Sequence, residues 1–358
     1  MTRAHNFCAG PAALPAEVLQ RVQTELLDWQ GVGASIMELS HRSPEFVGVA
    51  ERAEQSLRRL LGIGEDYAVL FQQGGASQQF ASVPLNLSRG DDTVDQVVTG
   101  QWSKKALAEG KRLVNVNVAS TSEDSNFSTI QAESDWQLTK CAAYLHYCPN
   151  ETIGGLEFDF VPRTHAPVVA DMSSTILSRP IDVDRFGVVY AGAQKNIGPA
   201  GLCLVIVKHE LLDRARSDIP AMLSWKIAAD NDSMDNTPPT FALYLSGLVF
   251  EWIEAKGGLA AMKALNEKKA STLYSTIDDS GFYTNPVDVR YRSLMNVPFT
   301  LADASLDKRF LEEAEAEQLL NLKGHRSVCG MRASIYNAVE QSSVDALCDF
   351  MHRFETKY

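Results

Sequence analysis

The sequence contains 358 residues, of which 45% are hydrophobic and 22% are charged. These proportions argue against a disordered chain, and the length suits one large domain together with a smaller one. With 33 lysine and arginine residues against 45 aspartate and glutamate residues, the formal net charge is -12. We therefore expect no nucleic-acid surface, because phosphate backbones are held by clustered basic residues. Small anionic ligands bound by individual arginines remain possible.

The cysteines and the N-terminal segment indicate a cytoplasmic protein. No two cysteines form a C-x-x-C pair, and their spacing is not that of a zinc site, so we expect free thiols and no metal. The N-terminus lacks a basic segment followed by an apolar run, and no stretch of about 18 apolar residues is present. We expect no contact with a membrane.

The first elements in chain order are two helices and a strand. Residues 15–30 and 43–61 have apolar residues at helical spacing, and the second pattern ends at Gly62. The run YAVLF (67–71) predicts a buried strand, after which QQGGASQQF (72–80) leads into another helical pattern.

Short apolar runs then recur as far as about residue 210. They are 96–100, 113–118, 142–147, 167–172, 187–192 and 202–207. Polar segments that are often compatible with helices separate most of them. This alternation is typical of an α/β fold around a mostly parallel sheet, with active-site residues at the strand ends.

The last third of the chain predicts long helices and a small α+β domain. Helices are expected over 241–258, 258–280, 307–324 and 344–357, and strands over 295–301 and 330–336. We predict an N-terminal arm (1–15) that packs on the active-site region, a large domain (16–257) and a small domain (258–358).

Asp171 and Lys195 form the first candidate site, because each follows an apolar strand. A lysine that attacks a carbonyl group must lose its proton, and partial burial at a strand end lowers the pKa of the ammonium group. A carboxylate beside a pyridine nitrogen would keep that nitrogen protonated. The spacing alone also fits an aspartate that caps a helix and a lysine in a solvated loop, so both interpretations stay open.

Two further patterns fit an anionic ligand. Glycines in the 72–80 loop let backbone N–H groups approach an anion at a helix N-terminus, although a plain tight turn fits equally well. Arg42, Arg326 and Arg332 occupy loop or strand-end positions, with His325 beside Arg326. Guanidinium groups bind carboxylates and phosphates with two hydrogen bonds, but a single arginine is usually a solvated surface residue.

Five segments together closely resemble the phosphoserine aminotransferase family. They are HYCPNETIGG (146–155), ADMSSTILSRPIDV (170–183), AGAQKNIGPAG (191–201), NTPPTFALYLSGLVFEW (236–252) and GHRSVCGMRASIYNA (324–338). The resemblance extends from FCAGPAALP near the N-terminus to the last helix. It implies the fold-type I, class V group of pyridoxal-phosphate enzymes, with a large domain around a mostly parallel sheet.

The resemblance implies a role for each residue that binds pyridoxal 5'-phosphate. Lys195 binds the cofactor aldehyde and moves the proton, Asp171 pairs with the ring nitrogen, and Trp102 stacks on the ring. Thr152 donates near the phenolic oxygen. The phosphate is held by Ala76, Ser77 and Gln194, and by Asn236 and Thr237 of a partner subunit.

The resemblance also implies the substrates and a homodimer with shared active sites. Arg332 binds the α-carboxylate, whereas His325 and Arg326, with His41 and Arg42 from across the dimer, form the pocket for the distal phosphate or carboxylate. L-Glutamate and 3-phosphohydroxypyruvate react by a ping-pong scheme, and a longer phosphorylated 2-oxo acid of pyridoxine biosynthesis is a further substrate. Some family members carry an arginine where this chain has Ser77, so that extra phosphate contact is absent here.

Other interpretations remain at this point. An alanine–glyoxylate type aminotransferase or a cysteine desulfurase would keep the fold, although no cysteine lies in an evident flexible loop. A non-catalytic dimeric binding protein would keep the fold without the reaction. The presence of Lys195, Asp171 and Arg332 argues against this last possibility.

Overall fold

The computed structural model describes residues 3–358, so the first two residues of the predicted N-terminal arm lie outside it. The helices are α1 (Ala16–Glu25), α2 (Pro44–Leu61), α3 (Ala76–Leu87), α4 (Gln101–Gly110), α5 (Trp225–Asp230), α6 (Thr240–Ala255), α7 (Gly258–Asp278), α8 (Asp307–Ala316) and α9 (Gln341–Lys357). The strands are β1 (His5–Asn6), β2 (Tyr67–Gly74), β3 (Thr93–Val98), β4 (Asn115–Thr121), β5 (Leu145–Tyr147), β6 (Asn150–Glu151), β7 (Leu156–Glu157), β8 (Val168–Asp171), β9 (Val188–Gly192), β10 (Gly201–Lys208), β11 (Tyr283–Thr284), β12 (Asn296–Leu301), β13 (Leu319–Leu320) and β14 (Met331–Ser334).

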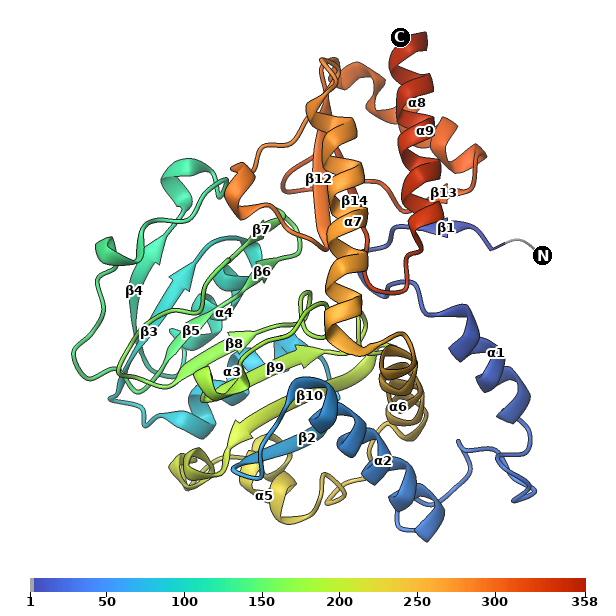
Figure 1. Ribbon diagram of the computed structural model, residues 1–358. Coiled ribbons are helices and arrows are strands. Elements are labelled where there is room, and N and C mark those ends of the chain that lie inside the picture. Colours follow the sequence, from blue (N-terminus) through green and yellow to red (C-terminus); the bar gives the residue numbers. More distant parts are fainter. Residues whose placement is uncertain (1–2) are drawn as a thin grey trace.

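The centre of the molecule is a seven-stranded sheet in the order β2-β10-β9-β8-β5-β3-β4 (Figure 1). Strand β10 runs antiparallel to both of its neighbours, whereas the pairs from β9 to β4 are all parallel. The predicted α/β fold with a mostly parallel sheet is therefore confirmed. In such a sheet the carboxyl ends of the parallel strands share one edge, and loops from several strands meet there.

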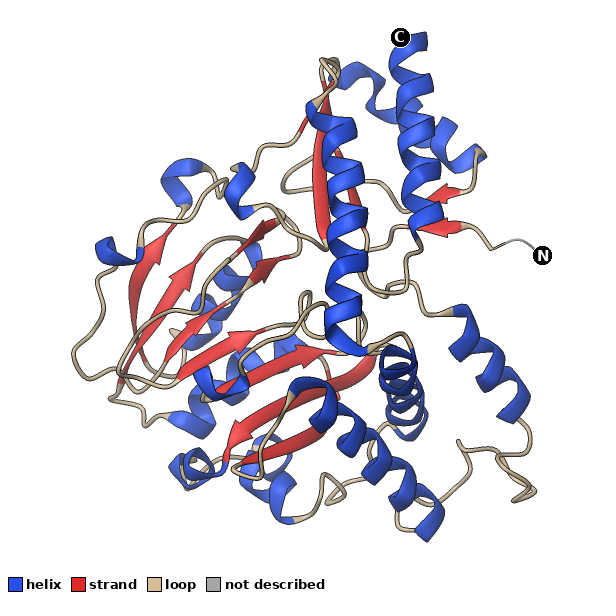
Figure 2. Ribbon diagram, viewed as in Figure 1, coloured by secondary structure: helices blue, strands red, loops and turns tan. Residues whose placement is uncertain are grey.

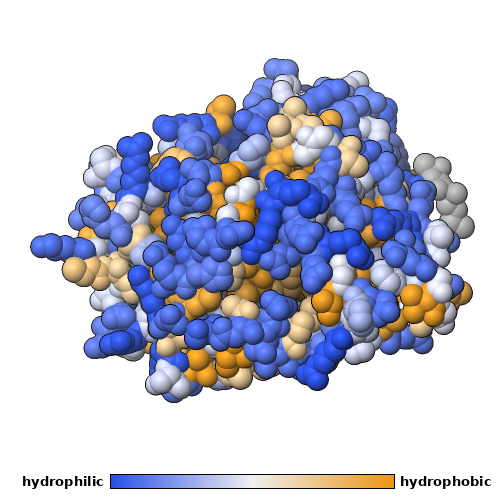
Figure 3. All heavy atoms as spheres, turned by 60° about the horizontal axis from the view of Figure 1, so that its bottom comes forward, coloured by the Kyte–Doolittle hydropathy of each residue, from blue (hydrophilic) through white to orange (hydrophobic). Residues whose placement is uncertain are grey.

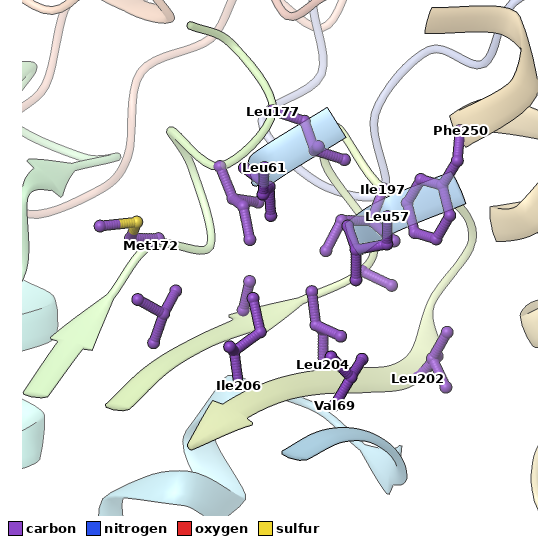
Figure 4. Packing of buried hydrophobic residues seen from close by; sticks show 14 of the residues in the cluster. Leu57, Leu61, Val69, Met172, Leu177, Ile197, Leu202, Leu204, Ile206 and Phe250 are labelled. Carbon is purple, nitrogen blue, oxygen red and sulfur yellow. The ribbon is translucent and has the colours of Figure 1, made fainter. Parts of the chain in front are cut away.

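Helices cover both faces of this sheet (Figure 2). On one face, side chains of α2 and α6 pack on β2 and β10, and Figure 4 shows Leu57, Phe250, Val69 and Leu204 in this layer. On the other face, a separate cluster joins residues of α3 and α5 to the sheet. Burial on both faces explains why the central strands β8, β9 and β10 are continuous apolar runs, whereas the edge strand β4 alternates.

The local sequence sets the ends of α2. Ser43 accepts a hydrogen bond from the backbone N–H of Phe46 at 3.3 Å, and Pro44 occupies the first helical position. Gly62 ends the helix in the left-handed conformation, with φ of 67°.

The C-terminal part contains the antiparallel sheet β11-β12-β14, against which α7, α8 and α9 pack around a separate hydrophobic core. Helix α7 extends from α6 beside the large sheet to this second sheet (Figure 1). The N-terminal strand β1 pairs in parallel with β13. Through this pairing, the beginning of the chain lies against its C-terminal part.

Two predicted helices are too long. The helix predicted over 15–30 ends at Glu25, and the one predicted over 307–324 ends at Ala316. In the second case, Gln318 and Asn321 have positive φ, and the two leucines between them form β13, which pairs with β1. An apolar pair that looked like a helix face is used in a strand because the N-terminal arm supplies a pairing partner.

The surface is mixed in polarity. On the face in Figure 3, hydrophilic side chains cover most of the surface and hydrophobic ones form smaller areas between them. Within residues 3–358, no helix combines the length and the hydrophobicity needed to cross a membrane.

Candidate active site

Lys195 lies just beyond the carboxyl end of β9, and its side chain is directed at Thr152. The Lys195 Nζ donates a hydrogen bond to Thr152 Oγ1 at 2.6 Å, and the residue is only 8% exposed. Asp171 ends the neighbouring strand β8, where it pairs with Tyr190 of β9. The two strand ends thus bring the lysine and the aspartate to one edge of the sheet, as the sequence predicts.

Burial sets the electrostatic state of both groups. Desolvation lowers the pKa of Lys195 to about 8, and the negative charge of Asp171 opposes that shift while the charge of Arg332 adds to it. Burial raises the pKa of Asp171, whereas hydrogen bonds from Ser173 and the charge of Lys195 lower it in part. A lysine with a pKa near 8 has a sizeable neutral fraction near neutral pH, as a nucleophile requires.

A cavity of about 110 Å³ lies between these residues, which is room for several water molecules or for part of a small ligand. Its wall consists of Gly75, Ala76, Ser77, Trp102, Cys148, Asn150, Thr152, Asp171, Ser173, Ser174, Gly192, Gln194 and Lys195. Seven of the predicted cofactor-binding residues are therefore brought together around one space. Cys148, Asn150 and Ser173 also line it and were not predicted.

Ser173 fixes the direction of the Asp171 carboxylate. Its backbone N–H and its hydroxyl both donate to Asp171 Oδ1, at 3.0 and 2.5 Å, and its hydroxyl accepts from the N–H of Gly192. No described residue donates to Oδ2, which is left for a group in the cavity. A serine two positions after an aspartate is a common turn pattern, and this pattern was the available signal in the sequence.

The N-terminus of α3 forms another wall. Gly75 precedes this helix, and the cavity reaches Ala76 and Ser77 in its first turn. A Cβ atom at Gly192 would lie 3.2 Å from the backbone nitrogen of Ala76, so the glycine lets the end of β9 approach the helix closely. Free N–H groups in the first turn and the helix dipole favour an anion at this point.

Trp102 closes one side of the cavity. Its indole Nε1 is buried without a hydrogen-bond partner among residues 3–358, and its ring centroid lies 5.8 Å from Lys195 Nζ. An aromatic face, an open carboxylate oxygen, a lysine amine and a helix N-terminus are the groups that pyridoxal phosphate needs for its ring, ring nitrogen, aldehyde and phosphate. The residues present therefore fit the cofactor that the sequence resemblance implies.

One of the predicted substrate-binding residues of the C-terminal part, Arg332, lies beside this cavity. Arg332 of β14 donates from Nη1 to the backbone oxygen of Thr152 at 3.2 Å. Partial burial, followed by the positive charges of Arg332, Arg326 and Lys105, lowers the pKa of His325. The positive charge of Arg332 thus lies next to Thr152, and His325 lies close enough to Arg332 and Arg326 for their charges to act on it.

The remaining predicted residues do not line the cavity of their own chain. His41 and Arg42 precede α2, and His41 Nε2 is buried with no partner in the described part of the chain. Asn236 and Thr237 are exposed, and the backbone oxygen of Thr237 accepts from the Gln73 amide. Within residues 3–358, no group of three or more His, Cys, Asp or Glu side chains could hold a metal ion.

The family model for aminotransferase class-V matches residues 4–347. This chain belongs to that family. Among curated proteins, it is 61% identical over 357 residues to the phosphoserine aminotransferase of Pseudomonas aeruginosa (strain LESB58), a match that covers 99% of both chains. Among solved structures, it resembles the phosphoserine aminotransferase from Bacillus circulans subsp. alkalophilus, with a TM-score of 0.97 and 48% identity over 99% of both chains.

A second similar structure contains the cofactor. It is the PLP-bound phosphoserine aminotransferase from Trichomonas vaginalis, which matches with a TM-score of 0.94 and 42% identity and covers 98% of this chain and 100% of that one. The similarity of these class-V members extends over the whole fold, including both sheets.

Proposed function

We propose that this class-V aminotransferase is a pyridoxal-phosphate-dependent phosphoserine aminotransferase. It transfers the amino group of L-glutamate to 3-phosphohydroxypyruvate, which gives 2-oxoglutarate and O-phospho-L-serine, the precursor of serine. The observation that carries the proposal is the enclosed contact of Lys195 with Thr152 beside Asp171 and the α3 N-terminus. The identity of 61% to a curated phosphoserine aminotransferase supports the same substrates.

The residues of the cavity each have a part in holding the cofactor. Asp171 Oδ2 would accept from the pyridine nitrogen, the Trp102 ring would stack on the pyridine, and Thr152 would donate near the phenolic oxygen. Ala76 and Ser77, with the Gln194 side chain, would hold the phosphate. Bound pyridoxal phosphate withdraws the electron pair of the substrate Cα–H bond.

The chain's own groups then control one proton. The neutral amine of Lys195 takes the proton from the substrate α-carbon as a general base. The resulting ammonium group would then deliver this proton to C4′ of the cofactor. Burial makes this possible near neutral pH, because it lowers the pKa of the amine to about 8. The charge of Asp171 would keep the ring nitrogen of the bound cofactor protonated.

The substrate carboxylate and phosphate require positive charge. Arg332 lies next to Thr152 and is proposed to bind the α-carboxylate with two hydrogen bonds. His325 and Arg326 are proposed to bind the distal phosphate of one substrate or the side-chain carboxylate of the other. The same groups would accept the longer phosphorylated 2-oxo acid of pyridoxine biosynthesis.

A homodimer with shared active sites accounts for the predicted residues that the single chain leaves outside its cavity. Asn236 and Thr237 are exposed, and the apolar side chains of Leu27 and Met37, close in sequence to Arg42, are 87% and 52% exposed. Exposed apolar residues that gather in one place mark contact with another protein surface, and Val32 of the same segment is exposed as well. We propose that these segments meet the partner subunit and deliver the four polar residues to its site.

The other proposals concern the chain as a whole. The arm over 1–15 packs on the active-site region, which is supported by the hydrogen bond from the N–H of Ala12 to the backbone oxygen of Gln194 at 2.9 Å. The division into domains over 16–257 and 258–358 is supported by the separate hydrophobic core of the C-terminal part, although Leu259, Met262, Val287 and Tyr291 pack in the core of the large sheet. A cytoplasmic location agrees with six cysteines that are all free.

The visible absorption spectrum of the purified, cofactor-loaded protein tests the function. L-Phosphoserine and L-glutamate, added in separate cuvettes, should each remove the absorption band of the lysine-bound cofactor. L-Alanine and L-cysteine should leave it unchanged at the same concentration. A response to alanine or cysteine alone would instead support an alanine–glyoxylate type aminotransferase or a desulfurase, and no response to any of the four would refute the proposal.

A further inference from the structure

Helix α4, which carries Trp102, has no side chain of its own that accepts from the N–H groups of Trp102 and Ser103. The Ser103 hydroxyl instead accepts from the N–H groups that precede the helix, those of Thr99 and Gly100, at 2.9 and 3.0 Å. Its N-cap residue is Gly100, and a glycine has no side chain that can accept hydrogen bonds from the first free N–H groups of a helix. These groups need acceptors because the beginning of α4 is largely buried.

The missing acceptor comes from Glu151, 48 residues further along the chain than Ser103. Its Oε2 accepts from the N–H of Trp102 at 3.0 Å, and its Oε1 accepts from the N–H and the hydroxyl of Ser103 at 2.9 and 2.6 Å. Glu151 is completely buried, and it has no salt-bridge partner among the described residues. A buried carboxylate without a cation is costly unless such donors surround it, so its presence here calls for a reason.

The position of Glu151 supplies that reason. It lies in β6 directly before Thr152, the residue that accepts from Lys195 Nζ. Glu151 itself is not part of the cavity wall. Its bonds therefore tie the backbone of the aromatic wall to the segment that contacts the lysine.

We propose that Glu151 is a positioning residue. It anchors the start of α4 and so keeps the Trp102 ring at its position beside Lys195, 5.8 Å from the amine. The inference rests on the proposed function, because it takes Trp102 as the stacking surface for the cofactor. The structural part of the inference does not depend on bound cofactor.

Gly100 provides an independent way to disturb the same carboxylate. A Cβ atom at this position would lie 2.5 Å from Cδ, 2.6 Å from Oε2 and 2.7 Å from Cγ of Glu151. The backbone of Gly100 has φ of 169°, an extended conformation that alanine adopts without strain. Gly100→Ala therefore displaces the Glu151 side chain and has no backbone penalty of its own.

The test compares Glu151→Gln, which keeps the shape but replaces one acceptor oxygen by a donor, with Gly100→Ala and the double variant. In the cofactor-free protein, hydrogen–deuterium exchange of peptides covering residues 99–105 should accelerate about ten- to hundredfold in each single variant, as loss of a hydrogen bond to a charged group implies. The double variant should exchange little faster than either, because both changes act through one carboxylate.

Cofactor binding and kinetics test the positioning role, because a residue that only caps the helix would change neither when it is replaced. In Glu151→Gln, the dissociation constant of pyridoxal phosphate should rise on the order of tenfold, the circular dichroism of the bound cofactor should weaken, and kcat should fall with little change in KM. The matched control is Glu254→Gln, which also replaces a hydrogen-bonded glutamate carboxylate, one that binds Ser56 and Arg59 in α2 and lies outside the cavity wall. It should leave the 99–105 exchange and the cofactor affinity unchanged.

Each outcome decides between the possibilities. Wild-type exchange in both Glu151→Gln and Gly100→Ala would overturn the anchoring, and faster exchange with unchanged cofactor affinity and circular dichroism would overturn the positioning role. If Glu151→Gln does not fold, Gly100→Ala carries the same test with the carboxylate still present. A chain that binds no cofactor yet exchanges faster in the variants would refute the proposed function and leave the anchoring intact.

Discussion

Replacing Lys269 by methionine should destabilise the fold by about 2–4 kcal/mol. Lys269 lies in α7, is 3% exposed, and donates from Nζ to the backbone oxygens of Ile335, Tyr336 and Val339 at 2.9, 2.7 and 2.9 Å. The oxygen of Tyr336 also accepts from the N–H of Val339 at 2.9 Å and keeps that donor, so two carbonyl oxygens lose theirs. Each buried carbonyl oxygen that loses its donor costs about 1–3 kcal/mol, which gives about 2–6 kcal/mol for two. The lower half of this range applies because the variant no longer buries a charged amine, and methionine fills the space of the lysine stem.

Urea unfolding of the cofactor-free protein measures this loss, since the free energy of unfolding falls linearly with urea concentration. Lys268→Met is the matched control, because Lys268 is the exposed neighbour on the same helix, and it should change the stability by less than about 0.5 kcal/mol. If the free energy of unfolding of Lys269→Met lies within about 1 kcal/mol of the wild-type value, the carbonyl oxygens do not need the amine as a donor, and the reasoning is refuted.

The pH dependence tests the charge state of the same group. Burial lowers the pKa of Lys269 to about 7, whereas an unfolded lysine has a pKa of about 10.4. Between these values the unfolded chain binds more protons than the folded one, so the stability that Lys269 contributes rises with pH. The difference between wild type and Lys269→Met should therefore widen by about 2 kcal/mol from pH 7 to pH 9. A difference that narrows would mean that the carbonyl oxygens hold the proton more strongly than water does.

Two further predictions concern the site. Capture of pyridoxal phosphate by the cofactor-free protein should accelerate with pH around a midpoint of about 8, because only the neutral amine of Lys195 attacks an aldehyde. Asp171→Asn should move this midpoint lower, since the charge of Asp171 raises the pKa of Lys195, and a stopped-flow midpoint near that of a free lysine, about 10.4, would contradict both statements. Mixing inactive Lys195→Ala and Arg42→Ala subunits should restore about a quarter of the wild-type sites, because half of the randomly assorted dimers contain one site without a lesion. An activity that stays at the level of the unmixed variants would place Arg42 in its own subunit's site.

The sequence predicts the sheet and its strand-end residues because these depend on short-range patterns. Buried strands give apolar runs, and parallel strands bring their carboxyl ends to one edge whatever the details of the loops. Asp171 and Lys195 could therefore be placed together from sequence, although their spacing alone was also compatible with a helix cap and a solvated lysine. The roles of Trp102, Thr152 and Gln194 came from the family resemblance, since nothing in their local sequence indicates a cavity.

The errors and omissions come from contacts between distant segments. The helix predicted beyond Ala316 fails because Leu319 and Leu320 pair with the N-terminal arm, at the opposite end of the sequence. Glu151 lies inside a recognised motif, but its function as an acceptor for α4 could not be inferred, because a glycine at an N-cap does not reveal which distant group replaces it. In these two cases the local sequence indicates that a helix begins, whereas contacts with distant segments determine where the helix ends or which group accepts from its first N–H groups.

The hairpin formed by β6 and β7 shows how such contacts concentrate at the site. Asn150 donates to the backbone oxygen of Ser174, Glu151 accepts from the start of α4, and Thr152 accepts from the Lys195 amine. Three successive residues therefore bind three separate segments. The turn that follows is closed by Gly155, whose φ is 72° and where an added Cβ atom would clash with Pro298 of β12. The hairpin is therefore packed closely against β12 at this point. The contacts to the start of α4 and to Lys195 thus come from successive residues of one hairpin rather than from two independent loops, and this places the buried Glu151 carboxylate between the aromatic wall and the lysine contact.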